Sequence, residues 1–181
     1  MILFEAMEYL TLGLILSREE GNEADSFLHI YTRDFGRIVA VAKSLRKITS
    51  KLSGHLLPGR LVSVRIVERN NGGWQAVDAV SFGFLPSSAE SLKFLRFLKE
   101  VTPLNESDPE VWKKILAAVE SGEIRREVYG SFLDTIGLGA SLSKCTNCGG
   151  EVAYFLPKDI IFMCKHCFQR SLISGNEAID I

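Results

Sequence analysis

Long hydrophobic runs are missing from this chain of 181 residues, whose longest wholly apolar stretches cover only a few positions. A membrane-spanning helix needs about 20 apolar residues in succession, so the sequence predicts no membrane segment. The first ten residues, MILFEAMEYL, contain two glutamates and no basic residue, a pattern that does not fit a secretory signal. We therefore expect a cytoplasmic protein without a membrane partner.

An excess of charge of either sign is missing as well. The 21 Lys and Arg nearly balance the 22 Asp and Glu, so the net charge of -1 gives no global argument for nucleic-acid binding. The chain also lacks a P-loop, an HExxH motif and a GxSxG motif, and its three histidines have no obvious partner in sequence. With 46% hydrophobic and 24% charged residues the composition is that of an ordinary globular protein. We expect a folded binding protein and no enzyme.

The first 85 residues contain five strand-like segments rich in β-branched and aromatic residues, separated by turn signals. Alternation is clearest where Val62, Val64 and Ile66 would share one face of a strand. The segments are Glu8–Leu16, Ser26–Thr32, Gly36–Ala42, Leu61–Glu68 and Trp74–Phe82, with a helical or irregular insert after the third. This pattern predicts a small closed barrel over residues 1–85. A five-stranded OB-fold fits it best, and an SH3-like barrel is the main competitor.

Residues 86–143 change to a helical period. A capping box at Ser87–Glu90 starts a first helix that ends at Thr102–Pro103. Its apolar positions are Leu92, Phe94, Leu95, Phe97, Leu98 and Val101. Pro109 begins a second helix that stops at Ser121–Gly122, and a third runs from Glu123 to Thr135 or Ile136, ended by Gly137 and Gly139. The fold class is therefore α+β, with a small helical domain over residues 86–181 that carries the cysteine module described next.

All four cysteines fall in one short segment, spaced Cys145-x2-Cys148-x15-Cys164-x2-Cys167. Two residues between cysteines let both sulfurs point at one ion, and two such knuckles supply the four thiolates that structural Zn²⁺ prefers. A redox dithiol would need a βαβ context, which is absent here. The sequence thus predicts a structural zinc module, with His166 left as a solvated loop residue. A short tail follows the module.

Charge is unevenly distributed within the predicted barrel. Residues 1–32 hold one basic and six acidic side chains, whereas residues 33–69 hold nine basic and two acidic ones. A basic stripe on a small β-barrel is typical of nucleic-acid binding, because Lys and Arg neutralise phosphates. The same pattern also fits a solvated face balanced by the acidic N-terminal segment. The candidate phosphate contacts are Arg37, Lys43, Arg46, Lys47, Lys51 and Arg65.

Four aromatic or histidine side chains lie near this segment: Phe27, His29, Tyr31 and Phe35. The first three share one strand parity. They fit either a platform on which unpaired bases stack or ordinary barrel core, and core packing is the commoner use of such residues in strands.

The order of these parts resembles the RecO family of DNA repair and recombination mediators. In the barrel the resemblance rests on Glu23-x-Asp25, Thr32-x3-Gly36-Arg37-Ile38, Ala42-Lys43, Arg46-Lys47, Ser50-Lys51-Leu52 and Leu56. Further along, Phe132-x3-Ile136-Gly137 leads through Leu142 into Cys145-x2-Cys148-Gly149, and Cys164-x2-Cys167 follows. Glycine is usual in the family at the position of Ser44, and a glycine pair is common where this chain has Lys158-Asp159-Ile160-Ile161. The helical region is also shorter than in typical members.

The resemblance implies an OB-fold, a helical domain and a zinc-binding module. It further implies a protein without enzymatic activity that binds single- and double-stranded DNA and anneals complementary strands at the bacterial nucleoid. With RecR, and in some settings RecF, such a protein helps RecA replace single-stranded DNA-binding protein at gaps. The shortened helical region is where family members contact the tail of single-stranded DNA-binding protein, which the resemblance implies as a further partner.

Two other classes of function compete with this interpretation. A zinc-ribbon RNA-binding or transcription/translation accessory protein would use the same basic surface but prefer RNA or a polymerase. An enzyme with an unrecognised site would show a deep pocket that gathers titratable groups.

Overall fold

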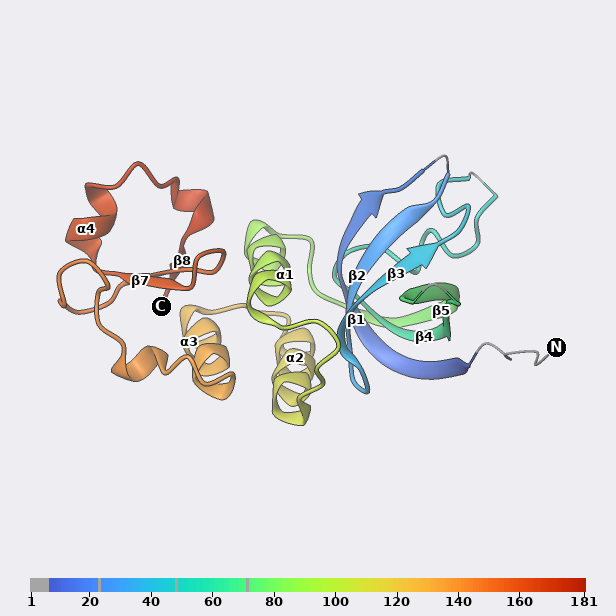
Figure 1. The fold of residues 1–181 in the computed structure, drawn as a ribbon, viewed down its shortest axis with the longest axis horizontal. Coiled ribbons are helices and arrows are strands. Elements are labelled where there is room, and N and C mark those ends of the chain that lie inside the picture. The colour runs from blue at the N-terminus through green and yellow to red at the C-terminus, as the bar shows by residue number, and fades with distance from the viewer. Residues whose placement is uncertain (1–6, 23, 48, 71) are drawn as a thin grey trace.

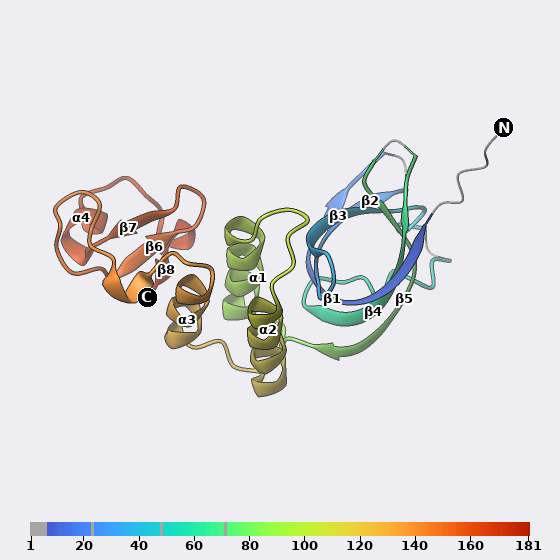
Figure 2. The ribbon, with the colours of Figure 1, turned by 60° about the horizontal axis from the view of Figure 1, so that its bottom comes forward.

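The computed structural model describes residues 7–22, 24–47, 49–70 and 72–181, and its three parts lie in a row (Figure 1). A barrel of five strands occupies one end, three helices lie in the middle, and a small module with the cysteines occupies the other end (Figures 1 and 2). Within the described residues no helix is long and apolar enough to cross a membrane. Glu23, part of the predicted barrel signature, lies outside the described residues.

The N-terminal sheet closes on itself in the order β1-β2-β3-β5-β4, the strand order of an OB-fold. Its strands are β1 (Glu8–Glu20), β2 (Ser26–Thr32), β3 (Gly36–Ala42), β4 (Arg60–Glu68) and β5 (Trp74–Phe84). All neighbours pair antiparallel except β3 and β5. The predicted second and third strands are confirmed to the residue, whereas β1 and β5 extend beyond their predicted ends.

Alternating side chains fill the barrel interior. Val62, Val64 and Ile66 of β4 are fully buried, as their spacing predicts, and they pack with Ile15, Leu28, Ile30, Ile38 and Ala40. The segment between β3 and β4 is irregular, and Leu45 and Leu56 anchor it by plugging the same core. The barrel therefore has a closed hydrogen-bonded wall and its own apolar interior.

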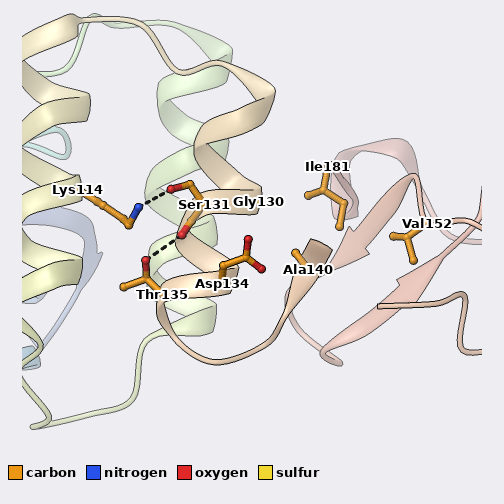
Figure 3. Close-up of a pocket in the computed structure, with 8 residues that line it drawn as sticks. All are labelled: Lys114, Gly130, Ser131, Asp134, Thr135, Ala140, Val152 and Ile181. Atoms are coloured by element: carbon orange, nitrogen blue, oxygen red, sulfur yellow. Dashed lines mark hydrogen bonds between the residues drawn. The ribbon is translucent and has the colours of Figure 1, made fainter. Parts of the chain in front are cut away.

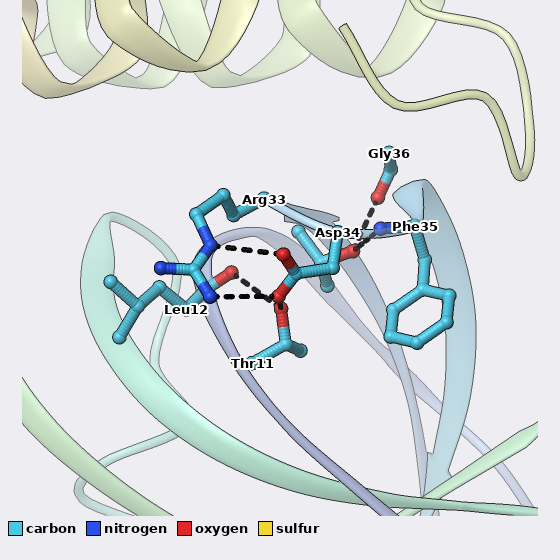
Figure 4. Close-up of polar contacts among 7 residues, drawn as sticks. Thr11, Leu12, Arg33, Asp34, Phe35 and Gly36 are labelled. Carbon is cyan, nitrogen blue, oxygen red and sulfur yellow. Dashed lines mark hydrogen bonds and ion pairs between the residues drawn. The ribbon is translucent and has the colours of Figure 1, made fainter. Parts of the chain in front are cut away.

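The turn between β2 and β3 is fixed by short polar contacts (Figure 4). The Thr11 hydroxyl donates to Asp34 Oδ2 at 2.6 Å, and Arg33 Nε donates to Asp34 Oδ1 at 3.0 Å. The Arg33 guanidinium and the Thr11 hydroxyl hold the pKa of the Asp34 carboxyl below its usual range. Gly36 has φ +65°, and a Cβ there would lie 1.8 Å from the Glu106 carbonyl oxygen. Only glycine suits this point, where the turn meets the loop before the second helix.

Three helices follow the barrel: α1 (Ala89–Val101), α2 (Pro109–Ser121) and α3 (Arg126–Thr135). Ser88 and Asp108 cap the first two by accepting backbone N–H groups. Apolar rings join α1, α3 and the module in one cluster of Phe94, Phe97, Tyr129, Phe132 and Phe155. Leu92, one of the predicted apolar positions of α1, is not buried in this cluster and is 62% exposed.

The helices cover one outer face of the barrel. Leu14, Leu16 and Tyr31 are buried there in a core shared with α1, α2 and α3. Arg37 Nε donates to the Thr102 carbonyl at 2.7 Å, and Lys99 Nζ lies 2.5 Å from Glu19 Oε1. The helices thus cover part of the barrel surface that would be exposed to solvent in an isolated barrel.

The C-terminal module contains β6 (Tyr154–Leu156), β7 (Ile161–Met163), α4 (Lys165–Gln169) and β8 (Ile179–Asp180). One 3-10 turn, Ala140–Leu142, precedes these elements, and a second, Gly175–Glu177, lies between α4 and β8. The segment predicted as a short tail instead forms β8, which pairs with β6 through Phe155 and Ile179. Local pattern gave no sign of this pairing, because two residues are too few to show alternation.

Candidate metal centre and nucleic-acid interface

The four cysteines converge at one point. The sulfurs of Cys145, Cys148, Cys164 and Cys167 all lie within 4.8 Å of one another. Cys145 and Cys148 sit in a tight turn that the Gly149 N–H closes on the Cys145 carbonyl at 2.8 Å. Gly149 has φ +73°, which suits glycine, and Cys164 caps α4, which carries Cys167. The turn and the helix start therefore aim all four sulfurs inward.

These sulfurs suit a cation that binds four thiolates. The Cys148 and Cys164 sulfurs are only 3.5 Å apart, and the Cys167 N–H points at the Cys164 sulfur at 3.3 Å. The Cys164 backbone lowers the pKa of the Cys145 thiol to about 6, while the Cys148 thiol raises that of Cys167 to about 12. Thiols this close share protons, and a divalent cation lets all four ionise together. The donor set thus fits a metal ion, and His166 is exposed beside it.

The basic segment after β3 presents three exposed lysines, Lys43, Lys47 and Lys51. Its path is held by the Asp25 carboxylate, which accepts the Ser44 N–H at 2.7 Å, and by the Ala24 carbonyl, which accepts the Arg46 N–H at 3.0 Å. Ser44 has φ +54°, a conformation that favours glycine. These contacts hold the start of the segment, and we call its three exposed lysines, Lys43, Lys47 and Lys51, the lysine ledge.

The three predicted arginines are placed differently from these lysines. Arg46 pairs with Glu20 at 3.1 Å and donates to the Gly21 carbonyl at 3.2 Å. Arg65 pairs with Glu8 at 2.9 Å on the outside of β4. Arg37 is held by Thr102, and burial lowers the pKa of its guanidinium. Lys43, Arg46, Lys47 and Lys51 thus share one segment, whereas Arg37 and Arg65 lie on β3 and β4 and are engaged there.

The four residues of the predicted aromatic platform also lie in different surroundings. Tyr31 is buried under the helices, and Phe35 packs edge-on against Tyr9 with 5.0 Å between ring centroids. His29 Nε2 lies 3.2 Å from Glu19, and burial lowers its pKa. Phe27 alone of the four is exposed, at 41%.

Sequence reasoning missed a group of exposed apolar side chains on β5. Val80, Phe82 and Phe84 are 59%, 56% and 61% exposed. The guanidinium carbon of Arg60 lies 5.3 Å from the centroid of the Phe84 ring. A strand of mixed apolar and small residues indicates a buried face, and the sequence carries no signal that this one points to solvent.

The largest pocket described lies between α2, α3 and the cysteine module, with a volume of about 630 Å³ (Figure 3). Lys114 donates to the Ser131 hydroxyl, and the Thr135 hydroxyl donates to the Ser131 carbonyl at 2.9 Å. Val152 and Ile181 form its far wall. Ser131 is exposed and Lys114 only half-buried, so the pair lacks the enclosure that activates a nucleophile. The pocket thus places an apolar wall opposite a cation, Lys114, and an anion, Asp134.

Comparison with known proteins adds a second line of evidence. Residues 7–82 match the family model described as Recombination protein O N terminal. The DNA repair protein RecO of Dehalococcoides mccartyi is 27% identical over 182 residues, which cover 88% of this chain and 70% of that protein. The chain is thus similar to RecO proteins over most of its length, and its N-terminal part matches the RecO N-terminal model. RecO of Rubrobacter xylanophilus is 26% identical over 88% of this chain and 71% of its own length.

The RecO resemblance is strongest in the barrel. RecO of Chlorobium phaeobacteroides is 34% identical over 80 residues, which cover 44% of this chain and 31% of that protein. The RecO signature Thr32-x3-Gly36-Arg37 coincides with a structural joint: Thr32 Oγ1 donates to the Gly36 carbonyl at 2.9 Å, and Arg37 holds the helical region through Thr102. These residues thus hold the turn between β2 and β3 and join the barrel to the helical region.

Proposed function

We propose that this chain is a DNA-binding recombination mediator of the RecO family. It binds single- and double-stranded DNA, anneals complementary strands and helps load recombinase on gapped DNA during repair. The observation that supports this most is the ledge of exposed lysines beside an OB-type barrel. We place its action in the cytoplasm at the nucleoid, as a protein without enzymatic activity.

The DNA contacts are electrostatic. Lys43, Lys47 and Lys51 reach solvent from one segment, whose backbone is held at Ser44 by the Asp25 carboxylate. Neutralising phosphates releases counterions and lowers the repulsion between two strands, which favours pairing of complementary bases. Arg46 reinforces the ledge while partly engaged by Glu20. Arg37 and Arg65 are the weakest of the six candidate contacts, because each already has a protein partner.

The metal at the four cysteines is Zn²⁺ in this proposal, and its role is structural. Four thiolates complete a tetrahedron and leave no position at which water could be activated. We further propose that the chain divides into the barrel of residues 1–85 and a helical unit of residues 86–181 that includes the module. The zinc then fixes the far end of the helical unit.

The protein partners we propose are a RecR-type protein and the tail of single-stranded DNA-binding protein. A chain end carries a carboxylate, and the pocket of Figure 3 offers an apolar wall beside the Lys114 ammonium. Lys114 also borders the neighbouring groove between α2 and α3, lined by Ala118 and Val128. The short helical region thus retains a surface on which such a tail fits.

Annealing of complementary oligonucleotides, bare and coated with single-stranded DNA-binding protein, tests the proposal over a range of salt concentrations. The triple variant K43A/K47A/K51A should lose affinity for every DNA sequence, and its salt dependence should fall by about three units of log-log slope. The matched control removes three exposed charges elsewhere, K113A/R125A/K158A, and should leave both quantities unchanged.

Each part of the proposal can fail separately. Annealing of bare strands alone would contradict the contact with the coat protein. Equal loss of affinity in both triple variants would contradict the lysine ledge. Preference for RNA with no annealing of DNA would favour the zinc-ribbon accessory function instead.

A further inference from the structure

The outer face of β5 is unusually apolar for a surface in contact with water. Val80, Phe82 and Phe84 are each more than half exposed, and they lie along one strand. A register shift between Leu61 and Val62 of β4 leaves Phe82 unpaired, which puts an extra residue into β5. Contiguous exposed apolar side chains usually mark a binding surface.

The basic segment runs directly onto this face. His55 Nδ1 accepts the Ser81 N–H at 3.2 Å, which fixes the end of the segment beside Val80 and Phe82. Arg60, the first residue of β4, holds its guanidinium over the Phe84 ring. Arg18 donates to the Ser53 hydroxyl at 3.4 Å and adds a further cation along the same path. The segment that carries the lysines is thus tied at its C-terminal end to the strand that carries the two exposed rings.

The other outer face of the barrel is less accessible. Leu14, Leu16 and Tyr31 are covered by the helices, and His29 is engaged by Glu19. A strand that follows the lysine ledge therefore meets the exposed rings of β5 more readily than the usual strand face of an OB-fold.

We propose that Phe82 and Phe84, beside Arg60, form a stacking platform for unpaired bases of a single nucleic-acid strand whose phosphates lie on the lysine ledge. The proposal rests on the DNA-binding function proposed above. Rings stack on any base through its flat face, and a guanidinium next to a ring favours a negative phosphate nearby. Stacking occupies the face of a base and leaves its pairing edge free, so a bound strand would remain able to pair.

Two consequences separate stacking from electrostatic binding. Bases inside a duplex are already stacked on each other, so the platform should favour single strands and contribute little to duplex binding. Stacking also releases no counterions, so its loss should lower affinity without changing the salt slope. Loss of the lysine ledge should instead weaken single-strand and duplex binding alike, and it should lower the salt slope.

The test measures binding of a labelled single-stranded oligonucleotide and of the matching duplex to the full chain at several salt concentrations. F82A/F84A should weaken single-strand binding by about tenfold or more, with the duplex affinity and the salt slope unchanged. F82L/F84L, which keeps apolar bulk and loses the rings, should show the same loss, whereas F82Y/F84Y should retain binding. Leu92→Ala removes an equally exposed apolar side chain from α1 and should have no effect.

The outcomes distinguish this platform from the proposed function. Unchanged single-strand affinity in F82A/F84A, with DNA binding by the unaltered chain intact, overturns the platform alone and leaves the β5 face as a protein contact. Equal loss of single-strand and duplex binding also overturns it. Absence of DNA binding by the unaltered chain contradicts the proposed function, and the same variants on single-stranded RNA then decide the platform.

Discussion

The barrel and the cysteine module are held together by different forces. The barrel closes five strands of seven to thirteen residues around a fully buried apolar interior. The module has strands of three, three and two residues, and its own core is the small cluster of Cys145, Leu156, Met163 and Cys167. Burial of apolar surface stabilises the first, whereas the second is too small for that and depends on its four sulfurs. One chain thus uses two sources of stability.

Removal of the metal should have the largest effect on stability, and it should affect the module far more than the barrel. Binding of structural zinc contributes on the order of 10 kcal/mol to the folding of small zinc domains. Chelation, or Cys148→Ser, should therefore unfold the module and loosen its contact with α3, while the barrel stays folded. Metal content and hydrogen exchange measured on the same samples check this.

Thr146→Ala changes an exposed residue in the same turn and should leave both metal content and exchange unaltered. A module that stays folded without metal would show that its apolar contacts are enough to hold it. That result would contradict the different sources of stability assigned to the barrel and the module.

Gly36→Ala should produce the next largest effect, this time in the barrel. The added Cβ would meet the Glu106 carbonyl, and alanine is disfavoured at φ +65°. We expect the free energy of unfolding to fall by about 3 kcal/mol, from strain and a displaced loop. Gly54→Ala is the control, since a Cβ there meets nothing within 4 Å. Equal effects of the two changes in thermal unfolding would contradict this role for Gly36.

The smallest expected effects come from two residues strained alike in the two regions. Ser44 in the barrel and Ile160 in the β6–β7 turn both have φ +54°, a conformation that favours glycine. Ser44→Gly and Ile160→Gly should each stabilise the chain by about 1 kcal/mol, because glycine adopts this conformation without a Cβ clash.

Hydrogen exchange in denaturant, measured separately for the barrel and the module, checks this. Ser44→Gly should raise the stability of the barrel, and Ile160→Gly that of the module. A loss of stability in either variant would mean that side-chain contacts outweigh the backbone strain. The β-branched side chain of Ile160 should make its gain the larger of the two.

Local patterns account for much of what was predictable. The limits of β2 and β3, the start of α2 at Asp108–Pro109 and the stop at Gly137 were predictable because each depends on residues a few positions apart, whereas the cap of α1 is Ser88, one residue after the predicted Ser87. Convergence of the cysteines followed from their spacing. The exposure of Leu92 was not predictable, because its spacing matches the buried face and only the neighbouring elements decide which face is covered.

Local sequence pattern predicted the five barrel strands, the three helices, the order of barrel, helices and module, and the residues able to bind a metal. Tertiary structure alone decided which cations are free: Arg37 is engaged by Thr102, 65 positions away, and Arg65 by Glu8, 57 positions away. It also decided that β8 completes the module and that Phe82 and Phe84 face solvent. Periodicity and capping depend on residues that are close in sequence. Strand pairing and burial depend on segments far apart in sequence that only the folded chain brings together.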